Sequence, residues 1–397
     1  MQAAGGLAAE ALGGAGAIVR DVHRGVARRV FGMLGEVAAP VRLAHDGIST
    51  LAHASVTAGL RAVPKSGGRA LALSAPPDAP SLADSPRGSF ALGAINGMWG
   101  DRLARDHAPL ALGFDLRVDG EAASKLAVFL HGLCETDEAW RLGGGPTYGE
   151  RLRQDLGHTP VYARYNTGRH ISENGRALAA ALEALVEEWP VAIDELVLDG
   201  HSMGGLVARS ACHYGEREGH SWTRELTHVF CLGSPHMGAP LERAAARGAH
   251  WLRRLPETAP LARLLTERSA GVKDLRYGAL LEEDWDGIDP DLWAADGCGE
   301  VPFLPGVTYC YVGATVARDK DSPLGKLVGD ALVQFPSASG EGPRRRLAFE
   351  LENGQHLGGV NHLQLLNHPR VHAQLLRWLT GSPAAGDPLG VPVRAGG

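Results

Sequence analysis

Gly200-His201-Ser202-Met203-Gly204-Gly205 is the stretch that decides the fold of this chain. It follows the short apolar run 195–199, which predicts a buried strand, and it precedes 206–209, which opens a helical pattern. A serine at a strand-to-helix turn is held in a strained backbone conformation, with its Oγ exposed above the sheet. Glycines must flank it because any Cβ would collide with the neighbouring strand or helix. The stretch therefore predicts the turn that presents a serine nucleophile; the alternative is a glycine-rich turn with an idle serine.

The composition is ordinary for a soluble globular protein. With 397 residues, the chain could hold one large α/β domain with additions, or two domains. Its 44% hydrophobic and 21% charged residues allow a sizeable core. The formal net charge is −6, and no basic run interleaved with aromatic residues occurs. These features exclude a nucleic-acid-binding protein.

The cysteines and the apolar runs bear on the compartment. The five cysteines have no paired spacing, which predicts neither a disulfide framework nor a zinc site and favours a reducing, cytoplasmic location. They are Cys134, Cys212, Cys231, Cys298 and Cys310. No run of 18 apolar residues occurs, so no membrane-spanning helix is expected. Residues 1–17 lack a basic segment before their apolar stretch, so a secretory signal is not expected.

Residues 1–85 are predicted to form a helical arm and a linker. Apolar residues recur every four positions in 18–30, with arginines on the other faces, and a second helical pattern follows Pro40. Residues 1–69 contain eight Lys and Arg against four Asp and Glu, a balance of +4. The stretch 74–87, with four prolines and small residues, is the predicted linker.

The arm has two possible roles. A basic amphipathic helix can lie on an anionic membrane, so residues 17–63 are a candidate for peripheral contact with a membrane or lipid surface. The alternative is that the apolar stripe packs on the main domain or on a partner chain, which the near absence of aromatic anchors favours. The sequence indicates no oligomeric state.

Residues 86–380 are predicted to form the main domain. Up to residue 238, strand and helix patterns alternate, which predicts a mostly parallel sheet covered by helices on both faces. The expected strands are 110–112, 115–118, 126–130, 160–165, 195–199 and 227–232. A helix is expected over 173–189, capped by Ser172 and ended by Pro190.

The second half of this domain contains an insertion. Residues 239–305 break the alternation and contain three tryptophans, which predicts a cap over the site. The tryptophans could contact an apolar substrate, or they could pack on the core. Strands are then expected over 307–312 and 346–351, and a closing helix over 368–379. Residues 381–397, rich in proline and glycine, are predicted to be a disordered tail.

The candidate nucleophile needs a histidine and an acid. A serine hydroxyl reacts only when a positioned imidazole takes its proton, and a carboxylate fixes the tautomer of that imidazole. In sheets of this kind the partners follow in the order serine, acid, histidine. His362 follows a glycine-containing loop and precedes an apolar helical segment, so it is the predicted base; His356, nearer the strand end, is the weaker alternative.

The predicted acid is Asp330, in the loop after the penultimate strand and between Ser202 and His362 in chain order. Asp199 lies one residue before the turn and points along its strand. Three other candidates fall in the predicted cap and look like solvated charges. They are Asp289, Asp291 and Asp296.

Attack on a carbonyl places charge on oxygen, which two preorganised backbone N–H groups can stabilise. One is predicted to be that of Met203, the residue after the nucleophile. The other is predicted to be that of Leu133, in the His131-Gly132-Leu133 loop that follows the strand 126–130. A simple turn would also explain the His-Gly pair alone.

Together these motifs resemble the α/β-hydrolase fold enzymes of the esterase/lipase group. The stretch 232–240, Leu-Gly-Ser-Pro-His-Met-Gly-Ala-Pro, is similar to a segment of bacterial lipases and of hydrolases that remodel lipid anchors. The resemblance spans roughly residues 88 to 380. Asp199 departs from it, because such sequences carry an apolar residue there.

The resemblance implies a serine hydrolase that cleaves a carboxylic ester with an apolar acyl part, with a small-molecule ester or lipid as substrate. No cofactor or metal is expected, because no ligand cluster occurs in the sequence. The same residues could instead transfer the acyl group to another acceptor, or cleave a thioester or amide. From a different class, the chain could be a lipid-surface binding module anchored by its arm.

Overall fold

The structure, a computed structural model, describes residues 85–106, 108, 110–238, 268–287, 298–342 and 345–381. The predicted arm, with its lipid-contact candidate 17–63, and the predicted tail therefore lie outside the described residues, apart from their boundary positions, and stay predictions. The same holds for much of the predicted cap, 239–305. No helix of the described part has the length and apolar character needed to cross a membrane.

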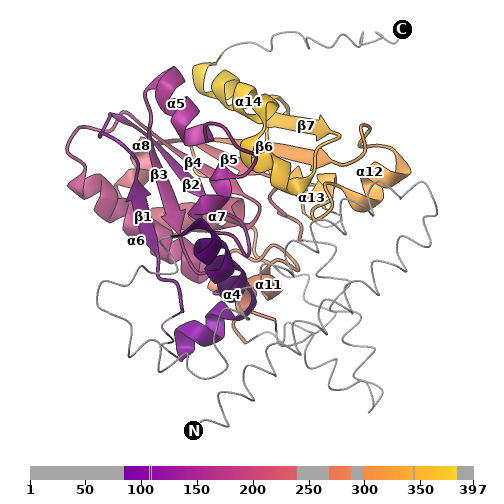
Figure 1. Cartoon of the computed structure of the whole chain (residues 1–397), viewed down its shortest axis with the longest axis horizontal. Helices are drawn as coiled ribbons and strands as arrows, with labels where there is room; N and C mark the ends of the chain where they lie inside the picture. Colours follow the sequence, from indigo (N-terminus) through magenta and orange to yellow (C-terminus); the bar gives the residue numbers. More distant parts are fainter. Residues whose placement is uncertain are drawn as a thin grey trace.

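The domain is built on one seven-stranded sheet (Figure 1). Its strand order is β1-β3-β2-β4-β5-β6-β7, and only β1 runs antiparallel to its neighbour. The strands are β1 (Asp115–Val118), β2 (Lys125–Leu130), β3 (Thr159–Arg164), β4 (Glu195–His201), β5 (Leu226–Leu232), β6 (Thr308–Thr315) and β7 (Gly354–Gly358). The predicted, mostly parallel sheet is confirmed. The expected strand at 110–112 is wrong, because these residues form a turn and an irregular segment.

Helices cover both faces of the sheet, as predicted. In β2, Leu126, Val128 and Leu130 belong to the apolar cluster under α6 (Ile171–Glu188) and α7 (Met203–Glu218). Ala127 and Phe129 belong to the cluster on the other face, under α5 (Tyr148–Leu156) and α14 (Pro369–Thr380). A strand buried on both faces has a continuous apolar sequence, which is why β2, β4 and β5 are visible in the sequence.

Shorter helices fill the connections between these elements. They are η3 (Asp137–Arg141), α8 (Trp222–Glu225), α11 (Ala270–Asp274), η5 (Glu282–Asp284), α12 (Pro323–Val328), α13 (Phe335–Ala338), η6 (Leu351–Asn353) and η7 (His362–Asn367).

The last strand differs from the prediction. Residues 346–350 are irregular apart from a single bridge between Arg346 and Glu341, and Leu351 begins η6. Phe349 packs on the rings of Phe303 and Tyr311. The last strand is instead β7, at the edge of the sheet, in which Leu357 is the one buried residue. A strand at the edge of a sheet is half solvated, so its sequence need not be apolar. The aromatic residue in 346–351 gives that segment a sequence typical of a strand, although no strand forms there.

The start of α6 also differs. The helix begins at Ile171 with His170 at the N-cap, and Glu173 completes a capping box by accepting from the His170 N–H. Ser172, the predicted cap, lies in the first turn, where its Oγ accepts a hydrogen bond from the Trp285 indole. A short polar side chain within the first turn can serve a tertiary partner instead of the helix terminus.

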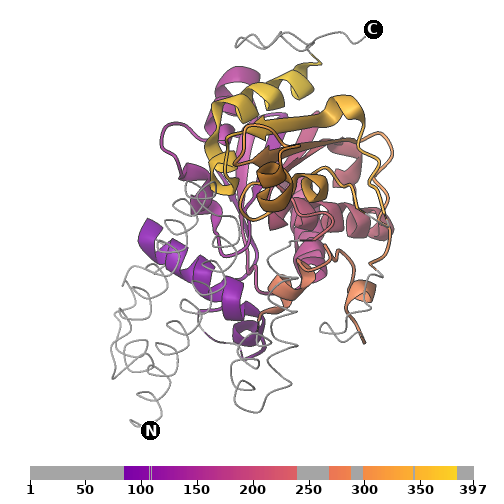
Figure 2. The ribbon, with the colours of Figure 1, turned by 90° about the vertical axis from the view of Figure 1, so that its right-hand side faces the viewer.

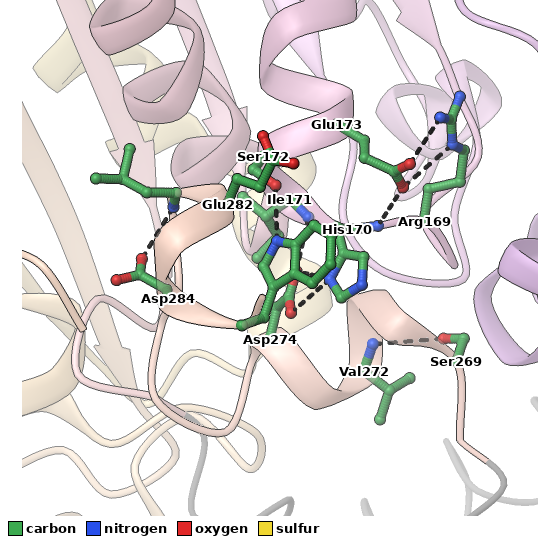
Figure 3. A network of polar contacts seen from close by, with 12 residues as sticks. Arg169, His170, Ile171, Ser172, Glu173, Ser269, Val272, Asp274, Glu282 and Asp284 are labelled. Carbon is green, nitrogen blue, oxygen red and sulfur yellow. Dashed lines mark hydrogen bonds and ion pairs between the residues drawn. The ribbon is translucent and has the colours of Figure 1, made fainter. Parts of the chain in front are cut away.

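That indole belongs to the described part of the predicted cap, which is fixed to the start of α6 (Figure 3). Asp274 accepts from the His170 ring at 3.0 Å and from the Ile171 N–H at 2.8 Å. The Trp285 ring stacks on His170 with 3.7 Å between the centroids. For this tryptophan, packing on the main domain explains the residue.

The helix at the start of the main domain was not predicted. α4 (Pro86–Arg105) begins at the N-cap Ser85, within the predicted linker. It lies at the opposite end of the molecule from α14 in both views (Figures 1 and 2). A Cβ on Gly93 would lie 2.7 Å from the Glu135 carbonyl oxygen, and one on Gly97 2.8 Å from the Cys134 Cα. The glycines therefore let α4 pack directly on the backbone of the loop that follows β2.

Candidate active site

Ser202 occupies a strained turn between β4 and α7. Its φ of 54° and ψ of −120° lie in a region that residues with a side chain rarely adopt. The turn is held by a hydrogen bond of 2.8 Å from the Ser202 N–H to the Leu232 carbonyl. A Cβ on Gly200 would collide with the backbone of 204–205, and one on Gly204 with the Leu130 carbonyl. Both glycines are required for the close approach that the sequence indicated.

The turn lies where the order of the sheet reverses. β2 pairs with β3 on one side and with β4 on the other. The chain therefore runs from β2 to β3 on one side and then crosses to the opposite side of β2 to form β4. The carboxyl ends of two such strands flank a crevice that commonly holds the site in open α/β sheets. The loop after β2 and the turn after β4 are therefore neighbours: a Cβ on Gly132 would lie 3.0 Å from the Ser202 Cβ.

Asp330 and His362 are brought together by loops after β6 and β7. The His362 Nδ1 lies 2.7 Å from the Asp330 Oδ2, and the His362 N–H donates to the Asp330 carbonyl at 3.0 Å. The other carboxylate oxygen, Oδ1, accepts from the backbone N–H groups of Leu332 and Val333. Both side chains are buried, with exposed fractions of 3% for His362 and 1% for Asp330. This arrangement fixes the carboxylate and leaves the Nε2 of His362 for another partner.

The His362 ring lies beside the turn that carries Ser202, the predicted nucleophile. Its centroid is 4.7 Å from that of His201, the residue before Ser202. Within the described residues, the Ser202 Oγ makes no hydrogen bond to His362. Such bonds are often long in unliganded sites and shorten when substrate binds.

His356, the weaker alternative for the base, has other partners. The His356 Nε2 pairs with the Thr315 Oγ1 at 2.8 Å, and its ring packs edge-on against Phe335. Three acids of the predicted cap fall outside the described residues: Asp289, Asp291 and Asp296.

The two predicted oxyanion donors have free N–H groups in the part of the chain that the structure describes. Met203 is the first residue of α7, where a helix leaves its amides unpaired and carries partial positive charge. In the other loop, the Gly132 N–H donates to the Glu135 Oε2 at 2.7 Å and the Cys134 N–H to the Thr167 Oγ1 at 3.1 Å. The Leu133 N–H, between them, has no hydrogen-bond partner within the described ranges.

The sequence does not predict a contact between Glu135 and His201, which lie 66 positions apart. The His201 Nδ1 lies 3.1 Å from the Glu135 Oε2, and its Nε2 lies 3.1 Å from the His362 carbonyl oxygen. Burial opposes charge on both groups, but their mutual attraction prevails, lowering the pKa of Glu135 and raising that of His201. A buried ion pair therefore joins the three loops of the site.

Asp199 is fully buried on β4, between Phe129 and Phe230 of the adjacent strands. Neither carboxyl oxygen has a hydrogen-bond partner within the described residues. Burial raises the pKa of Asp199 well above its ordinary value, because an ionised carboxylate loses its hydration there. The strand before the Ser202 turn thus carries an acid whose burial favours the protonated form, where the resemblance leads one to expect an apolar residue.

Asp199→Asn should make stability less dependent on pH. The folded wild type keeps a proton on Asp199 that the unfolded chain releases above about pH 4, so its free energy of unfolding falls as pH rises from there toward the native pKa. The variant has no such group, and its advantage over wild type should therefore grow with pH. Urea unfolding between pH 4 and 8 measures this difference, with the exposed Asp194→Asn as control. A difference that stays constant across this range would contradict a protonated Asp199.

Among the described residues, no group of three or more His, Cys, Asp or Glu side chains is arranged to hold a metal ion.

A comparison with known families matches part of the chain. Residues 162–253 match the sequence model of a family described as a PGAP1-like alpha/beta domain. The matched segment covers β4, the Ser202 turn, α7 and β5, and it spans less than a quarter of the chain. No curated protein sequence is significantly similar to this chain.

Several solved structures are similar at low sequence identity. A lipase of Bacillus licheniformis, BlEst2 in its mature form, is 18% identical over 67% of this chain and 97% of that chain, with a TM-score of 0.43. An esterase of Pyrobaculum calidifontis is 14% identical over 68% and 80%, with a TM-score of 0.39. YbtT, a type II thioesterase of yersiniabactin biosynthesis, is 16% identical over 67% and 98%, with a TM-score of 0.38. At these values the similarities carry no argument about the reaction.

Proposed function

We propose that the chain is a serine hydrolase of the α/β-hydrolase fold that cleaves carboxylic esters with an apolar acyl part. The observation that carries the proposal is the buried Asp330–His362 pair, at the same edge of the sheet as the strained Ser202 turn. The three residues come from separate loops, in the chain order that this fold uses for its nucleophile, acid and base.

The proposed reaction begins with the Ser202 Oγ attacking the ester carbonyl while the His362 Nε2 takes its proton. Asp330 holds the hydrogen of His362 on Nδ1, which leaves the Nε2 lone pair free for this step. The charge that forms on the carbonyl oxygen is stabilised by the N–H groups of Leu133 and Met203. His362 then protonates the departing alcohol, and a water molecule, activated in the same way, hydrolyses the acyl-enzyme to the acid and free Ser202.

A series of p-nitrophenyl esters tests the proposal. An apolar acyl group is proposed because residues 239–305 are rich in leucine and contain Trp251 and Trp293 in addition to Trp285, which packs on the main domain. The value of kcat/KM should therefore rise from acetate to longer chains. Each buried methylene contributes about 0.8 kcal/mol to binding, which is roughly fourfold in kcat/KM. A maximum of kcat/KM at acetate would contradict the preference for an apolar acyl part, but it would leave ester hydrolysis in place. No turnover of any ester by folded protein would contradict ester hydrolysis.

Product analysis in the presence of added alcohols separates hydrolysis from acyl transfer. Hydrolysis yields the free acid in proportion to the p-nitrophenol released. If a new ester is the dominant product, the acceptor of the acyl group is the alcohol and not water. The role of Ser202 would be unchanged.

A further inference from the structure

We propose that Glu135 and His201 form a positioning ion pair that holds the oxyanion loop, the nucleophile turn and the His362 loop in one catalytic arrangement. The inference rests on the proposed function, because it assigns these two residues to the same reaction. Neither residue touches the reacting atoms in the proposed mechanism.

Hydrogen-bond chemistry defines the charge state of the pair. The His201 Nδ1 faces a carboxylate oxygen and its Nε2 faces the carbonyl oxygen of His362. A carbonyl oxygen only accepts, and an ionised carboxylate only accepts, so the ring must donate from both nitrogens. A histidine that donates twice is an imidazolium. His201 is therefore a buried cation, and Glu135 is its counter-ion.

The carboxylate of Glu135 also shapes the oxyanion loop. Its Oε2 accepts the Gly132 N–H at 2.7 Å in addition to the His201 ring. This bond occupies the Gly132 amide, whereas the next amide, that of Leu133, has no hydrogen-bond partner among the residues that the structure describes. The backbone of Cys134 then continues at a φ of 63°, a conformation that needs support from its surroundings.

The cation acts on the other two loops. His201 precedes Ser202 directly, so any shift of its ring moves the nucleophile turn. Its second bond ends on the backbone of His362, the residue proposed as the base. One imidazolium thus sets the separation between nucleophile and base, and its counter-ion sets the position of the oxyanion donor.

Burial makes the pair sensitive to the loss of either member. His201 is fully buried, and Glu135 lies largely inside the loop. Removing one charge from a buried ion pair leaves the other uncompensated, which is costly. The charged or titratable groups facing the pair are His131, Cys134 and Tyr165 near Glu135, and Asp330 and the His362 ring near His201.

The pair predicts an alkaline limb in the pH–rate profile. Because Glu135 raises the pKa of His201, the imidazolium keeps its proton to a higher pH than an ordinary histidine and loses it as the pH rises further. The neutral ring can donate to only one of its two acceptors, so one loop is released. Activity should therefore decline on the alkaline side, and removing the counter-ion should move this decline to lower pH.

Glu135→Gln tests the inference. The amide oxygen can still accept the Gly132 N–H, but the charge opposite His201 is lost. We expect kcat for a p-nitrophenyl ester to fall about 10- to 100-fold, somewhat less than for deletion of an oxyanion donor, with KM changed less than twofold. The inhibition constant of an alkyl boronic acid, which forms an oxyanion on Ser202, should rise with the fall in kcat/KM. The alkaline limb should move to lower pH.

Glu195→Gln is the matched control. Glu195 contacts the buried His158 at 3.5 Å at the other end of β4, about 20 Å from the nucleophile turn at the usual rise of about 3.3 Å per residue. This substitution also breaks a buried histidine–glutamate contact. It should lower the melting temperature without moving the pH profile or the boronate affinity.

His201→Gln combined with Glu135→Gln keeps the inference testable if the single variant does not fold. The double variant leaves no unpaired charge buried, and its alkaline limb should disappear. Suppose that the wild type is active and that Glu135→Gln, or the double variant, keeps the wild-type pH profile and boronate affinity. This result would overturn the positioning role of the pair and leave the proposed function in place. A wild type inactive toward every ester would instead overturn the proposed function, and the inference with it.

Discussion

Ser202→Ala should lower kcat for ester hydrolysis by roughly 10⁶-fold, the order of magnitude known for loss of a serine nucleophile that works with a histidine. The substitution removes the atom that forms the acyl-enzyme and keeps the Cβ, so the turn and its neighbours remain as they are. The free energy of unfolding should change by less than about 1 kcal/mol. Steady-state turnover and urea unfolding of the purified variant measure the two effects.

Ser234→Ala is the control for this substitution. Ser234 is buried near α7, and its Oγ has no partner among the described residues, so the same atom is removed without loss of a hydrogen bond. Activity should persist there. Turnover by Ser202→Ala at more than a hundredth of the wild-type rate would contradict the nucleophile.

The strain at Ser202 gives the same experiment a second readout. Its φ of 54° costs little for glycine and more for alanine. Ser202→Gly should therefore be inactive and yet more stable than Ser202→Ala, by about 1 kcal/mol. Equal stability of the two variants would mean that the turn stores no strain.

Asp330→Asn should lower kcat by about 10⁴-fold, the size of effect known when the acid of a Ser-His-Asp triad becomes an amide. The amide oxygen would take over the two backbone N–H groups that now bind Oδ1, which turns the NH₂ group toward His362. The His362 Nδ1 would then have to accept, so its hydrogen would move to Nε2. An Nε2 that carries a hydrogen cannot take the proton of Ser202.

Asp155→Asn is the matched control, because Asp155 contacts the His372 ring at 2.8 Å on the surface of the domain. The pair has the same chemistry as Asp330 and His362 but lies on α5 and α14, away from the Ser202 turn. The control should keep wild-type kcat. Retention of more than a tenth of wild-type kcat by Asp330→Asn would contradict the tautomer-fixing role of Asp330.

Local patterns predict the parts of this fold that are buried on both faces. β2, β4 and β5 are continuous apolar runs between glycine-rich turns, and the strained serine requires glycines at fixed positions around it. The edge strand β7 lacks that signal because only Leu357 is buried in it. The aromatic packing of Phe349 gave residues 346–351 a strand-like sequence without a strand.

The tertiary contacts of the site are less accessible from sequence. Asp330 and His362 could be chosen because chain order in this fold restricts the candidates. No spacing or motif in the sequence predicts the Glu135–His201 contact, because it forms only when two loops meet at the edge of the sheet. The glycines of α4 at positions 93, 97 and 100 were a usable signal, because their spacing places them on one face of a helix.

The residue that reacts with a fluorophosphonate tests the central claim most directly. The reagent phosphonylates an activated serine, and peptide mass spectrometry locates the adduct. We expect one adduct per chain, on Ser202, absent in Ser202→Ala, retained in Ser234→Ala and formed much more slowly in Asp330→Asn. An adduct on another residue, or no adduct on folded wild-type protein, would contradict Ser202 as the nucleophile.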